Sequence, residues 1–525
     1  MRDTRHSAIL AAVIMLAATA YAGPAWVNRY DGPDNGGDEA NMVVTDRAGN
    51  VYVTGGSETP ANGDDWATIK LLPSGDTAWV RRADGWGHGE DVAYALAVDT
   101  AGNVIVTGYT TNTGANVNIA TIKYDPDGNL VYVKEYDGPA HAADGALSVA
   151  VDQAGNAYVV GYVQSAANGK DWVIIKYLPS GDTAWSRQAD GWGHGDDVIY
   201  GVALDPSGNI IASGYTTSTG GNLNTGTIKS DPDGNAIYVK EYDGPTHNED
   251  AAYALAVDRD GNAYITGASV GATNVDYVTV KYLSNVDTAW TRCYNGPANG
   301  DDYAAGIAVD NAGNACVTGY SNGSGSGKDW LTIKYLPSGD TAWTRRANGW
   351  FNAADESYAV AVGPFGDVFV TGYTTSTGGN VNYGTIKYLS DGSLGWVEEY
   401  DGPVAGADRA KSIALDTAGN VFVTGRSPGS ASALDYATVK YAATLGVAET
   451  PNAELRMPNV PTIVCGELLL PGSAIRHSTF ALLNSVGRMV MDLASGPNDV
   501  GSLAPGVYFV RQDGVPEAAR VLVVR

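Results

Sequence analysis

Four histidines recur at one position of a repeated sequence pattern, and three of them are followed closely by acidic residues. The runs are HGED, HGDD and HNED, which place Glu90 and Asp196 two residues after His88 and His194, with the same pattern at His247. Imidazole and carboxylate groups are metal ligands. Equivalent positions of neighbouring repeats lie a whole repeat apart in space, however, so these histidines would not share one ion. We interpret them as parts of solvated loops, with metal binding as the alternative.

Three tryptophans lie in the same segments, among Gly, Asn and Asp residues. Exposed aromatic rings with polar neighbours can stack on sugar rings. The copies that carry this tryptophan have alanine three residues earlier, where the other copies have tyrosine. The exchange favours packing of the tryptophan into the space that tyrosine fills elsewhere, and sugar binding is the alternative. The candidate ligand-binding residues are therefore Trp86, His88, Glu90, Trp192, His194, Asp196, His247 and Trp350.

An aspartate recurs in all eight copies, at the entry to the first strand-like run. The set is Asp38, Asp91, Asp144, Asp197, Asp250, Asp302, Asp355 and Asp408. Because a catalytic group is normally needed only once, we expect these carboxylates to accept hydrogen bonds from loop N–H groups. A ring that binds a divalent cation such as calcium is the alternative, and no other cofactor is predicted.

A lysine recurs in eight copies and a turn aspartate in seven, at the same end of the repeat. Two such pairs are Lys123 with Asp99 and Lys229 with Asp205. We predict a Lys–Asp ladder that holds the turn between the first two strands against the third strand. Gly363 replaces the aspartate in one copy, so Lys387 is expected to lack that partner.

These residues are positioned by a repeat of 52 or 53 residues with one aromatic residue per copy, at Trp26, Trp79, Tyr132, Trp185, Tyr238, Trp290, Trp343 and Trp396. Each copy contains four short strand-like runs, such as AYALAV, NVIVTGY, ATIKY and AWVRR, and no helical periodicity of useful length. Four strands in a repeat of this length are typical of a β-propeller blade. A glycine that ends the second strand, such as Gly55 or Gly108, indicates close packing of a neighbouring blade.

The order of the runs within a blade predicts how the ring closes. If AYALAV is the innermost strand and AWVRR the outermost, residues 25–30 have no blade of their own and the last copy lacks a fourth strand. We predict that residues 25–30 complete the last blade, because such closure removes open sheet edges. The expected fold class is all-β: an eight-bladed propeller of four-stranded blades over residues 23–447, with a small β-sandwich after it.

The repeated pattern D-x-x-G-N-x-Y-x-x-G, followed by a strand that ends in lysine, resembles the SBBP bacterial β-propeller repeat family. The resemblance covers residues 25–447 and implies the propeller fold. It says little about function, because propellers carry many activities.

The two ends of the chain indicate export. Residues 1–22 have two arginines, an apolar run and an Ala-x-Ala ending, which predict a cleaved signal peptide. Residues 448–462 read as a linker and residues 463–525 as a β-sandwich. Gly487-Arg488, the run GVYFV from Gly506 and the closing VLVVR resemble the type IX secretion sorting domain, which implies contact with outer-membrane secretion machinery. A module that stabilises the propeller is the alternative.

Composition narrows the classes of function. A formal net charge of −26 argues against nucleic acid as a partner, and no segment is long enough to span a membrane. Three scattered cysteines imply no disulfide framework.

We expect a secreted or cell-surface, non-enzymatic scaffold that binds an extracellular polysaccharide or an envelope protein. A quinone-dependent dehydrogenase or another propeller enzyme is one alternative, although Leu71 stands where that dehydrogenase motif has aspartate. A purely structural envelope component is the other.

Overall fold

The computed structural model contains two compact units, of which the larger comprises residues 23–444 and the smaller includes residues 445–525. The structure describes residues 23–443 without 60–62, 167–168, 350–351, 377 and 430–432, together with seven strands between residues 462 and 523. The predicted signal peptide and residues 448–461 of the predicted linker lie outside the described residues. No helix long and apolar enough to cross a membrane occurs in the described part of the chain.

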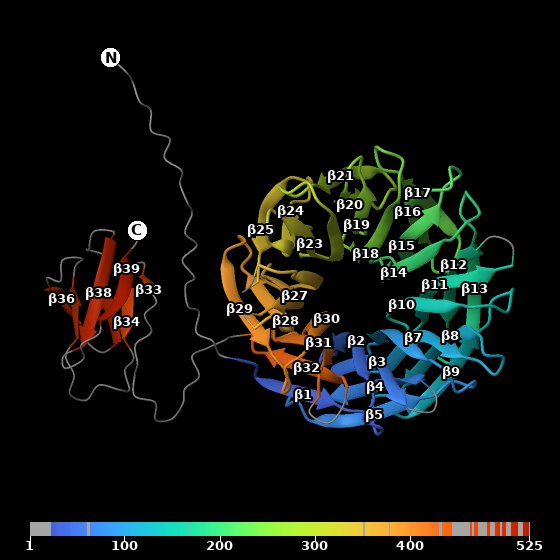
Figure 1. Ribbon diagram of the computed structural model, residues 1–525, viewed down its shortest axis with the longest axis horizontal. Coiled ribbons are helices and arrows are strands. Elements are labelled where there is room, and N and C mark those ends of the chain that lie inside the picture. Colours follow the sequence, from blue (N-terminus) through green and yellow to red (C-terminus); the bar gives the residue numbers. More distant parts are fainter. Residues whose placement is uncertain are drawn as a thin grey trace, which may run out of the picture. The chain divides into compact units, whose positions relative to one another are not determined.

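Eight antiparallel sheets of four strands each make up the larger unit, arranged as blades around a central opening (Figure 1). We name the strand positions A to D from the opening outward. Blade 1 is β2 (Asp38–Thr45), β3 (Val51–Thr59), β4 (Gly63–Leu71) and β5 (Thr77–Ala83). Blade 2 is β6 (Val92–Val98), β7 (Val104–Thr111), β8 (Val117–Tyr124) and β9 (Leu130–Tyr136). Blade 3 is β10 (Gly145–Val151), β11 (Ala157–Ser165), β12 (Gly169–Tyr177) and β13 (Thr183–Ala189). Blade 4 is β14 (Val198–Leu204), β15 (Ile210–Thr217), β16 (Leu223–Ser230) and β17 (Ala236–Tyr242).

The second half of the ring repeats this arrangement. Blade 5 is β18 (Asp250–Val257), β19 (Ala263–Val270), β20 (Val275–Tyr282) and β21 (Thr288–Tyr294). Blade 6 is β22 (Asp302–Val309), β23 (Ala315–Gly323), β24 (Gly327–Tyr335) and β25 (Thr341–Ala347). Blade 7 is β26 (Glu356–Val362), β27 (Val368–Thr375), β28 (Val381–Tyr388) and β29 (Leu394–Tyr400). Blade 8 is β30 (Arg409–Leu415), β31 (Val421–Ser427), β32 (Asp435–Tyr441) and β1 (Trp26–Tyr30).

The first strand of the chain closes the ring, as predicted. Strand β1 pairs antiparallel with β32, with Trp26 opposite Lys440 and Tyr30 opposite Tyr436. The Arg29 guanidinium also lies 2.7 Å from a carboxylate oxygen of Asp435 on β32. The predicted eight-bladed, four-stranded propeller is therefore confirmed, with its strand order.

The recurring aromatic residue of strand D joins each blade to the next. The Trp79 ring of blade 1 lies 6.0 Å from that of Tyr124 in blade 2, and its Nε1 donates a hydrogen bond of 3.1 Å to the Pro126 carbonyl. The indoles of Trp26, Trp185 and Trp290 donate equivalent bonds to prolines. Because the buried clusters also combine side chains of consecutive blades, the hydrophobic core lies between the sheets.

A β-bulge interrupts strand A of every blade opposite the glycine that ends the regular part of strand B. In blade 2 the register shifts between Ala93 and Ala95, so Tyr94 is the extra residue, and Ala93 faces Gly108. A Cβ added to Gly108 would overlap the carbonyl oxygen of Val92, and the equivalent glycines meet the same obstacle. The nearest obstacle is therefore the bulged strand of the same blade, not the neighbouring blade as predicted. A tyrosine hydroxyl of the neighbouring blade also excludes a Cβ at Gly55 and Gly319.

The predicted Lys–Asp ladder forms direct ion pairs in blades 2, 4 and 6, whereas Lys440 of blade 8 donates to the Pro73 carbonyl instead. Lys123 lies 3.4 Å from Asp99 and Lys229 lies 2.8 Å from Asp205, both pairs buried, and blade 6 has an equivalent pair. In blades 1, 3 and 5 a tyrosine on strand B intervenes: the Tyr158 hydroxyl donates to Asp152 at 3.1 Å, while Lys176 donates to the Pro232 carbonyl at 2.8 Å. Tyr52 and Tyr264 act in the same way.

Lys387 lacks the turn aspartate, as expected, but another carboxylate takes its place. Lys387 forms an ion pair of 2.8 Å with Asp367, four residues after Gly363. Asp367 stands where the other turns have asparagine, so the carboxylate has moved from the first to the fifth residue of the turn. Blade 7 therefore keeps the ion pair by a different sequence.

The smaller unit contains strands β33 (Thr462–Val464), β34 (Glu467–Leu470), β35 (Phe480–Leu483), β36 (Met489–Leu493), β37 (Gly496–Asp499), β38 (Gly506–Gln512) and β39 (Ala518–Val523). Five of them form a sheet in the order β33-β39-β38-β35-β36, and β34 pairs with β37. The predicted β-sandwich and sorting domain stay predictions. Residues 487–488, which carry part of the sorting-domain resemblance, lie outside the described residues.

Candidate functional site

The recurring aspartates tie together two loops on one face of the ring. Asp91 is fully buried, and its two carboxylate oxygens accept hydrogen bonds of 2.5 Å from the N–H groups of Gly85 and Thr111. Asp197 binds Gly191 and Thr217 in the same way. Burial raises the pKa of Asp91 to about 6, against the opposing effect of these N–H donors. In blades 2, 3, 4, 6 and 7 the aspartate thus fastens the loop that enters strand A to the end of strand B. In blades 1, 5 and 8 it accepts the bond from the loop glycine, but no backbone N–H of strand B among the described residues bonds to it.

Each loop histidine pairs with an aspartate that precedes it, not with the acids that follow it. His88 Nδ1 lies 2.6 Å from Asp84, and His194 lies 2.6 Å from Asp190. His141 and His247 repeat the pair, and all four have φ between 49° and 54°. Glu90 instead accepts from the Tyr109 hydroxyl at 3.3 Å. The histidines are exposed and held one to a loop, as the solvated-loop interpretation expects.

Asp196, the other predicted acid behind a histidine, accepts a hydrogen bond of 3.0 Å from the N–H of Lys170 on blade 3. It therefore links the loop of His194 to strand C of the preceding blade. Neither Glu90 nor Asp196 forms an ion pair with its histidine in the described part of the chain.

The loop tryptophans do not pack where the alanine-for-tyrosine exchange predicts. Trp86 is 47% exposed and Trp192 is 46% exposed. The space beside Ala83 and Ala189 is taken by other indoles, because each faces a buried strand C tryptophan, Trp66 or Trp172. The compensating aromatic residue thus comes from strand C, and the loop tryptophans are left available for a ligand. Trp350 lies outside the described residues.

Carboxylates gather at three junctions between blades. The groups are Asp31 with Asp38 and Asp435, Asp65 with Asp84 and Asp91, and Asp171 with Asp190 and Asp197, each with oxygens within 4.8 Å of one another. Carboxylate oxygens are the ligands that Ca²⁺ prefers. Calcium binding stays a prediction, and its candidate ligands include strand C aspartates that sequence reasoning missed.

In most blades an acidic side chain on one of the outer strands C and D binds a side-chain donor on the other. Arg82 lies 3.1 Å from Asp65, and arginine–aspartate pairs recur in blades 6 and 8. Blades 2, 4 and 7 replace them with an asparagine that donates to a glutamate. Blade 3 departs from both patterns, because Gln188 stands in the arginine position and donates to the Tyr136 hydroxyl at 2.8 Å. Burial, followed by the charges of Asp190 and Asp197, raises the pKa of Asp171.

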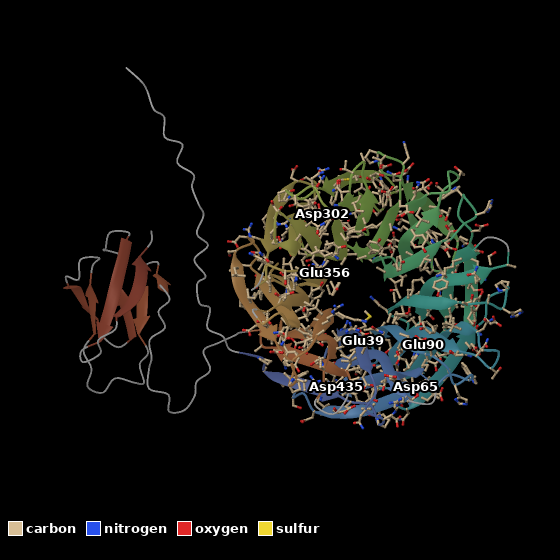
Figure 2. All side chains as sticks on the ribbon, viewed as in Figure 1. Glu39, Asp65, Glu90, Asp302, Glu356 and Asp435 are labelled. Atoms are coloured by element: carbon tan, nitrogen blue, oxygen red, sulfur yellow. The ribbon has the colours of Figure 1, made fainter. Side chains whose placement is uncertain are left out.

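The repeats differ from one another at the mouth of the central opening. Three positions vary there: the residue after the buried aspartate, the bulge residue of strand A, and the residue after the strand B glycine. Glu39 and Glu356 occupy the first position and lie beside the opening (Figure 2). A bulge redirects a side chain out of the regular alternation of a strand. These positions therefore present variable side chains at the mouth on a constant scaffold.

In each of blades 2 to 7 a tyrosine occupies one or two of these three positions. We call these tyrosines the tyrosine arc: Tyr94, Tyr109, Tyr162, Tyr200, Tyr215, Tyr253, Tyr303, Tyr320, Tyr358 and Tyr373. Their rings form pairs within blades, such as Tyr94 with Tyr109 at 5.8 Å, and between blades, as in Tyr200 with Tyr253 at 5.9 Å. Tyr94 is 37% exposed and Tyr253 is 39% exposed. Burial raises the pKa of Tyr253 to about 12, so its hydroxyl is neutral near pH 7.

A pocket of about 140 Å³ lies within the arc at blades 4 to 6. Its lining includes Tyr200, Tyr215, Tyr253, Tyr303 and Glu249. Aromatic faces with a few polar groups are typical of small-ligand sites. A second pocket of about 390 Å³ lies on the outer strands of blades 1 and 2, away from the mouth, and is lined by residues such as Arg81 and Leu130.

Charged residues replace the tyrosines in blades 8 and 1. Strand A of blade 8 carries Arg409 and Lys411, and strand B carries Arg426. Glu39 of blade 1 lies 2.8 Å from Lys411 and 3.3 Å from Arg426. We call Arg409, Lys411 and Arg426 the cationic wall. No sequence pattern marked these residues beforehand, but the concentration of three basic residues at variable positions of one repeat was a signal.

Comparison with known proteins agrees with the fold. Residues 290–325 match the family model described as a beta-propeller repeat, SBBP. An uncharacterized WD repeat-containing protein of Acanthamoeba polyphaga mimivirus is 25% identical over 342 residues, a match that covers 53% of this chain. This chain spans about a quarter of that relative, because the match covers 24% of its length.

Solved structures give more distant matches. A crystal structure of a eukaryotic initiation factor has a TM-score of 0.37 at 11% identity, covering 69% of this chain and 88% of that one. A gluconolactonase of Xanthomonas campestris has a TM-score of 0.30 at 14% identity, covering 52% and 82%. With its eight four-stranded blades and its family match, the chain is a β-propeller repeat protein.

Proposed function

We propose that this propeller is an exported or cell-surface scaffold that binds an extracellular polysaccharide, without catalysis, at the tyrosine arc. The observation that carries the proposal is the row of tyrosines that continues over six blades at one mouth of the ring, all of them partly exposed except the buried Tyr373. Aromatic faces stack on the C–H faces of sugars, and tyrosine hydroxyls bond to sugar hydroxyls. An envelope protein is the alternative partner.

The loop face extends this surface. Trp86 and Trp192 project from loops that enter strand A, at the same end of the blades as the tyrosine arc. A polymer that crosses the mouth would therefore meet aromatic side chains at the rim as well as at the opening. Such a spread of contacts suits a chain molecule better than a single small metabolite. The proposed roles of residues 1–22 as export signal and of residues 463–525 as sorting domain fit an extracellular ligand.

Glycan-array screening of the exported form, residues 23–525, tests the proposal. The best ligand would then be measured by isothermal titration calorimetry with Tyr253→Ala and with Phe365→Ala as control. Phe365 is 87% exposed in the turn between strands A and B, at the other end of the blade. We expect Tyr253→Ala to weaken binding about 3- to 10-fold, since one aromatic contact contributes roughly 0.5–1.5 kcal/mol. Phe365→Ala should leave the affinity unchanged. No glycan bound, or equal affinity in both variants, contradicts the proposal.

A further inference from the structure

The cationic wall is a local reversal of charge in an acidic protein. The chain has a formal net charge of −26, yet blade 8 places Arg409, Lys411 and Arg426 at three mouth positions where other blades have mainly tyrosine or small residues. Arg409 and Arg426 are direct partners in the register of β30 and β31. Like charges directly opposite each other on adjacent strands are destabilising. The protein therefore keeps an unfavourable pair at the mouth.

The acidic groups nearby do not neutralise this wall. Glu39 forms ion pairs with both Lys411 and Arg426. The wall therefore has three positive charges against one negative charge. Glu356, from the neighbouring blade, is already held by Lys328 at 2.6 Å and by the Tyr358 hydroxyl at 2.9 Å.

Arg409 has the greatest unused capacity for hydrogen bonding. Within the described residues it forms no ion pair, and its buried Nε has no acceptor. Its guanidinium lies 5.1 Å from the ring centre of Tyr373, which belongs to the tyrosine arc. The buried Nε of Arg426 also has no acceptor in this part of the chain. A guanidinium has five donors in a planar fork that matches a carboxylate or sulfate.

We infer that the cationic wall is an anion subsite that holds a carboxylate or sulfate group of the ligand. The two Nε atoms are closed to solvent, so an anion between Arg409 and Arg426 would accept hydrogen bonds from their terminal Nη groups and relieve the repulsion between the two charges. Because Arg409 lies against the buried Tyr373 ring, the wall is continuous with the tyrosine arc. The ligand class is therefore an acidic polysaccharide whose sugar rings lie on the exposed tyrosines and whose charged groups reach blade 8. The inference rests on the proposed function for the sugar chain, but the anion subsite can be measured separately.

Titration calorimetry with polygalacturonate and with its fully methyl-esterified form measures how much the carboxylate charge of the ligand contributes to binding. On the full chain, we expect the acid to bind at least about 10-fold more tightly than the ester, which matches one charge-assisted hydrogen bond or more. Arg409→Gln should abolish this preference. Arg47→Gln removes the same charge from an exposed turn between strands A and B and should retain it. If the wild type binds polygalacturonate and its methyl ester equally, the anion subsite is overturned. The subsite is also overturned if Arg409→Gln keeps the preference for polygalacturonate. Neither result contradicts the proposed function.

A second variant tests the subsite even if Arg409→Gln fails to fold. Glu39→Gln removes the competing carboxylate and keeps all three cations, so we expect tighter binding of polygalacturonate, by several-fold. Unchanged or weaker binding contradicts the inference. Dextran sulfate against dextran, measured in the same way, distinguishes sulfate from carboxylate as the preferred group.

If neither form of any polymer binds, the proposed function fails and the subsite is tested alone. Thermal unfolding would be compared in sodium sulfate, sodium galacturonate and sodium chloride at equal ionic strength. A higher midpoint of the wild type in sulfate or galacturonate, absent in Arg409→Gln, supports the subsite. Equal shifts in the two proteins overturn it.

Discussion

Removal of one buried lysine should destabilise the propeller strongly in one blade and weakly in the next. Lys229 of blade 4 lies 2.8 Å from Asp205, and both side chains are 4% exposed. Burial works to raise the pKa of Asp205, but the hydrogen bonds from Lys229 and Asn209 outweigh it, so the pKa is lowered. In Lys229→Met the carboxylate stays buried with its counter-charge gone. Breaking one side of a buried pair costs about 3–5 kcal/mol. Asn209 still donates to Asp205, so we expect about 3 kcal/mol.

Lys176 of blade 3 is the matched control. Its aspartate, Asp152, accepts from the Tyr158 hydroxyl and Asn156 instead, so Lys176→Met leaves that carboxylate satisfied. The variant loses the hydrogen bond to the Pro232 carbonyl, which contributes about 1 kcal/mol. The two substitutions are chemically identical and lie in neighbouring blades. Any difference between them therefore reports the environment of the aspartate.

Urea unfolding followed by tryptophan fluorescence measures both variants against the wild type. We expect the unfolding midpoint of Lys229→Met to fall by clearly more than that of Lys176→Met. Asp205→Asn added to Lys229→Met should recover part of the loss, because it removes the unpaired charge. Stability also depends on pH: the lowered pKa of Asp205 contributes stability above the pKa of its unfolded state, and this is lost as pH falls through the folded value. If Lys176→Met lowers the midpoint as much as Lys229→Met or more, the distinction between direct Lys–Asp pairs and aspartates held by tyrosine is refuted.

Three further outcomes are expected. Gly108→Ala should lower the unfolding midpoint or prevent folding, because the added Cβ overlaps a carbonyl oxygen. Gly201→Ala should be tolerated, since the atom nearest to its added Cβ lies 3.5 Å away. Equal midpoints of the two variants would contradict this. The hydrogen bond from His88 to Asp84 raises the pKa of His88, so its loop is stabilised below the unfolded pKa and loses that contribution as pH rises through the folded value. NMR titration should give a lower His88 midpoint in Asp84→Asn, and an unchanged one would reject the pair. Gln188→Arg should raise the free energy of unfolding by about 1 kcal/mol, because it restores the arginine–aspartate pair of blades 1, 6 and 8. A lower free energy of unfolding would show that blade 3 differs in more than this residue.

The repeat made the scaffold predictable. Eight copies of one aromatic residue defined the blade boundaries, and the unmatched residues 25–30 implied closure by β1. Errors arose where two positions compensate for each other in space. Trp86 was assigned to the space beside Ala83, which Trp66 of a different strand fills. The actual partner of Lys387 was missed because Asp367 stands four residues after the position of the missing aspartate.

The mouth could not be predicted from periodicity alone. Whether Tyr94 or Lys411 faces the opening depends on the β-bulge in strand A, which breaks the alternation that a sequence pattern assumes. The bulge itself is marked only by a glycine on the neighbouring strand. Once the bulge is known, comparison of equivalent positions separates the tyrosine arc from the cationic wall.

A crystal structure of residues 23–525 with the best-binding oligosaccharide tests the central claim most directly. The account predicts a sugar ring against Tyr200 and Tyr253 at the mouth, with an acidic substituent directed toward Arg409. Sugar bound only at the outer pocket lined by Arg81 and Leu130, or along the outer strands, would contradict it.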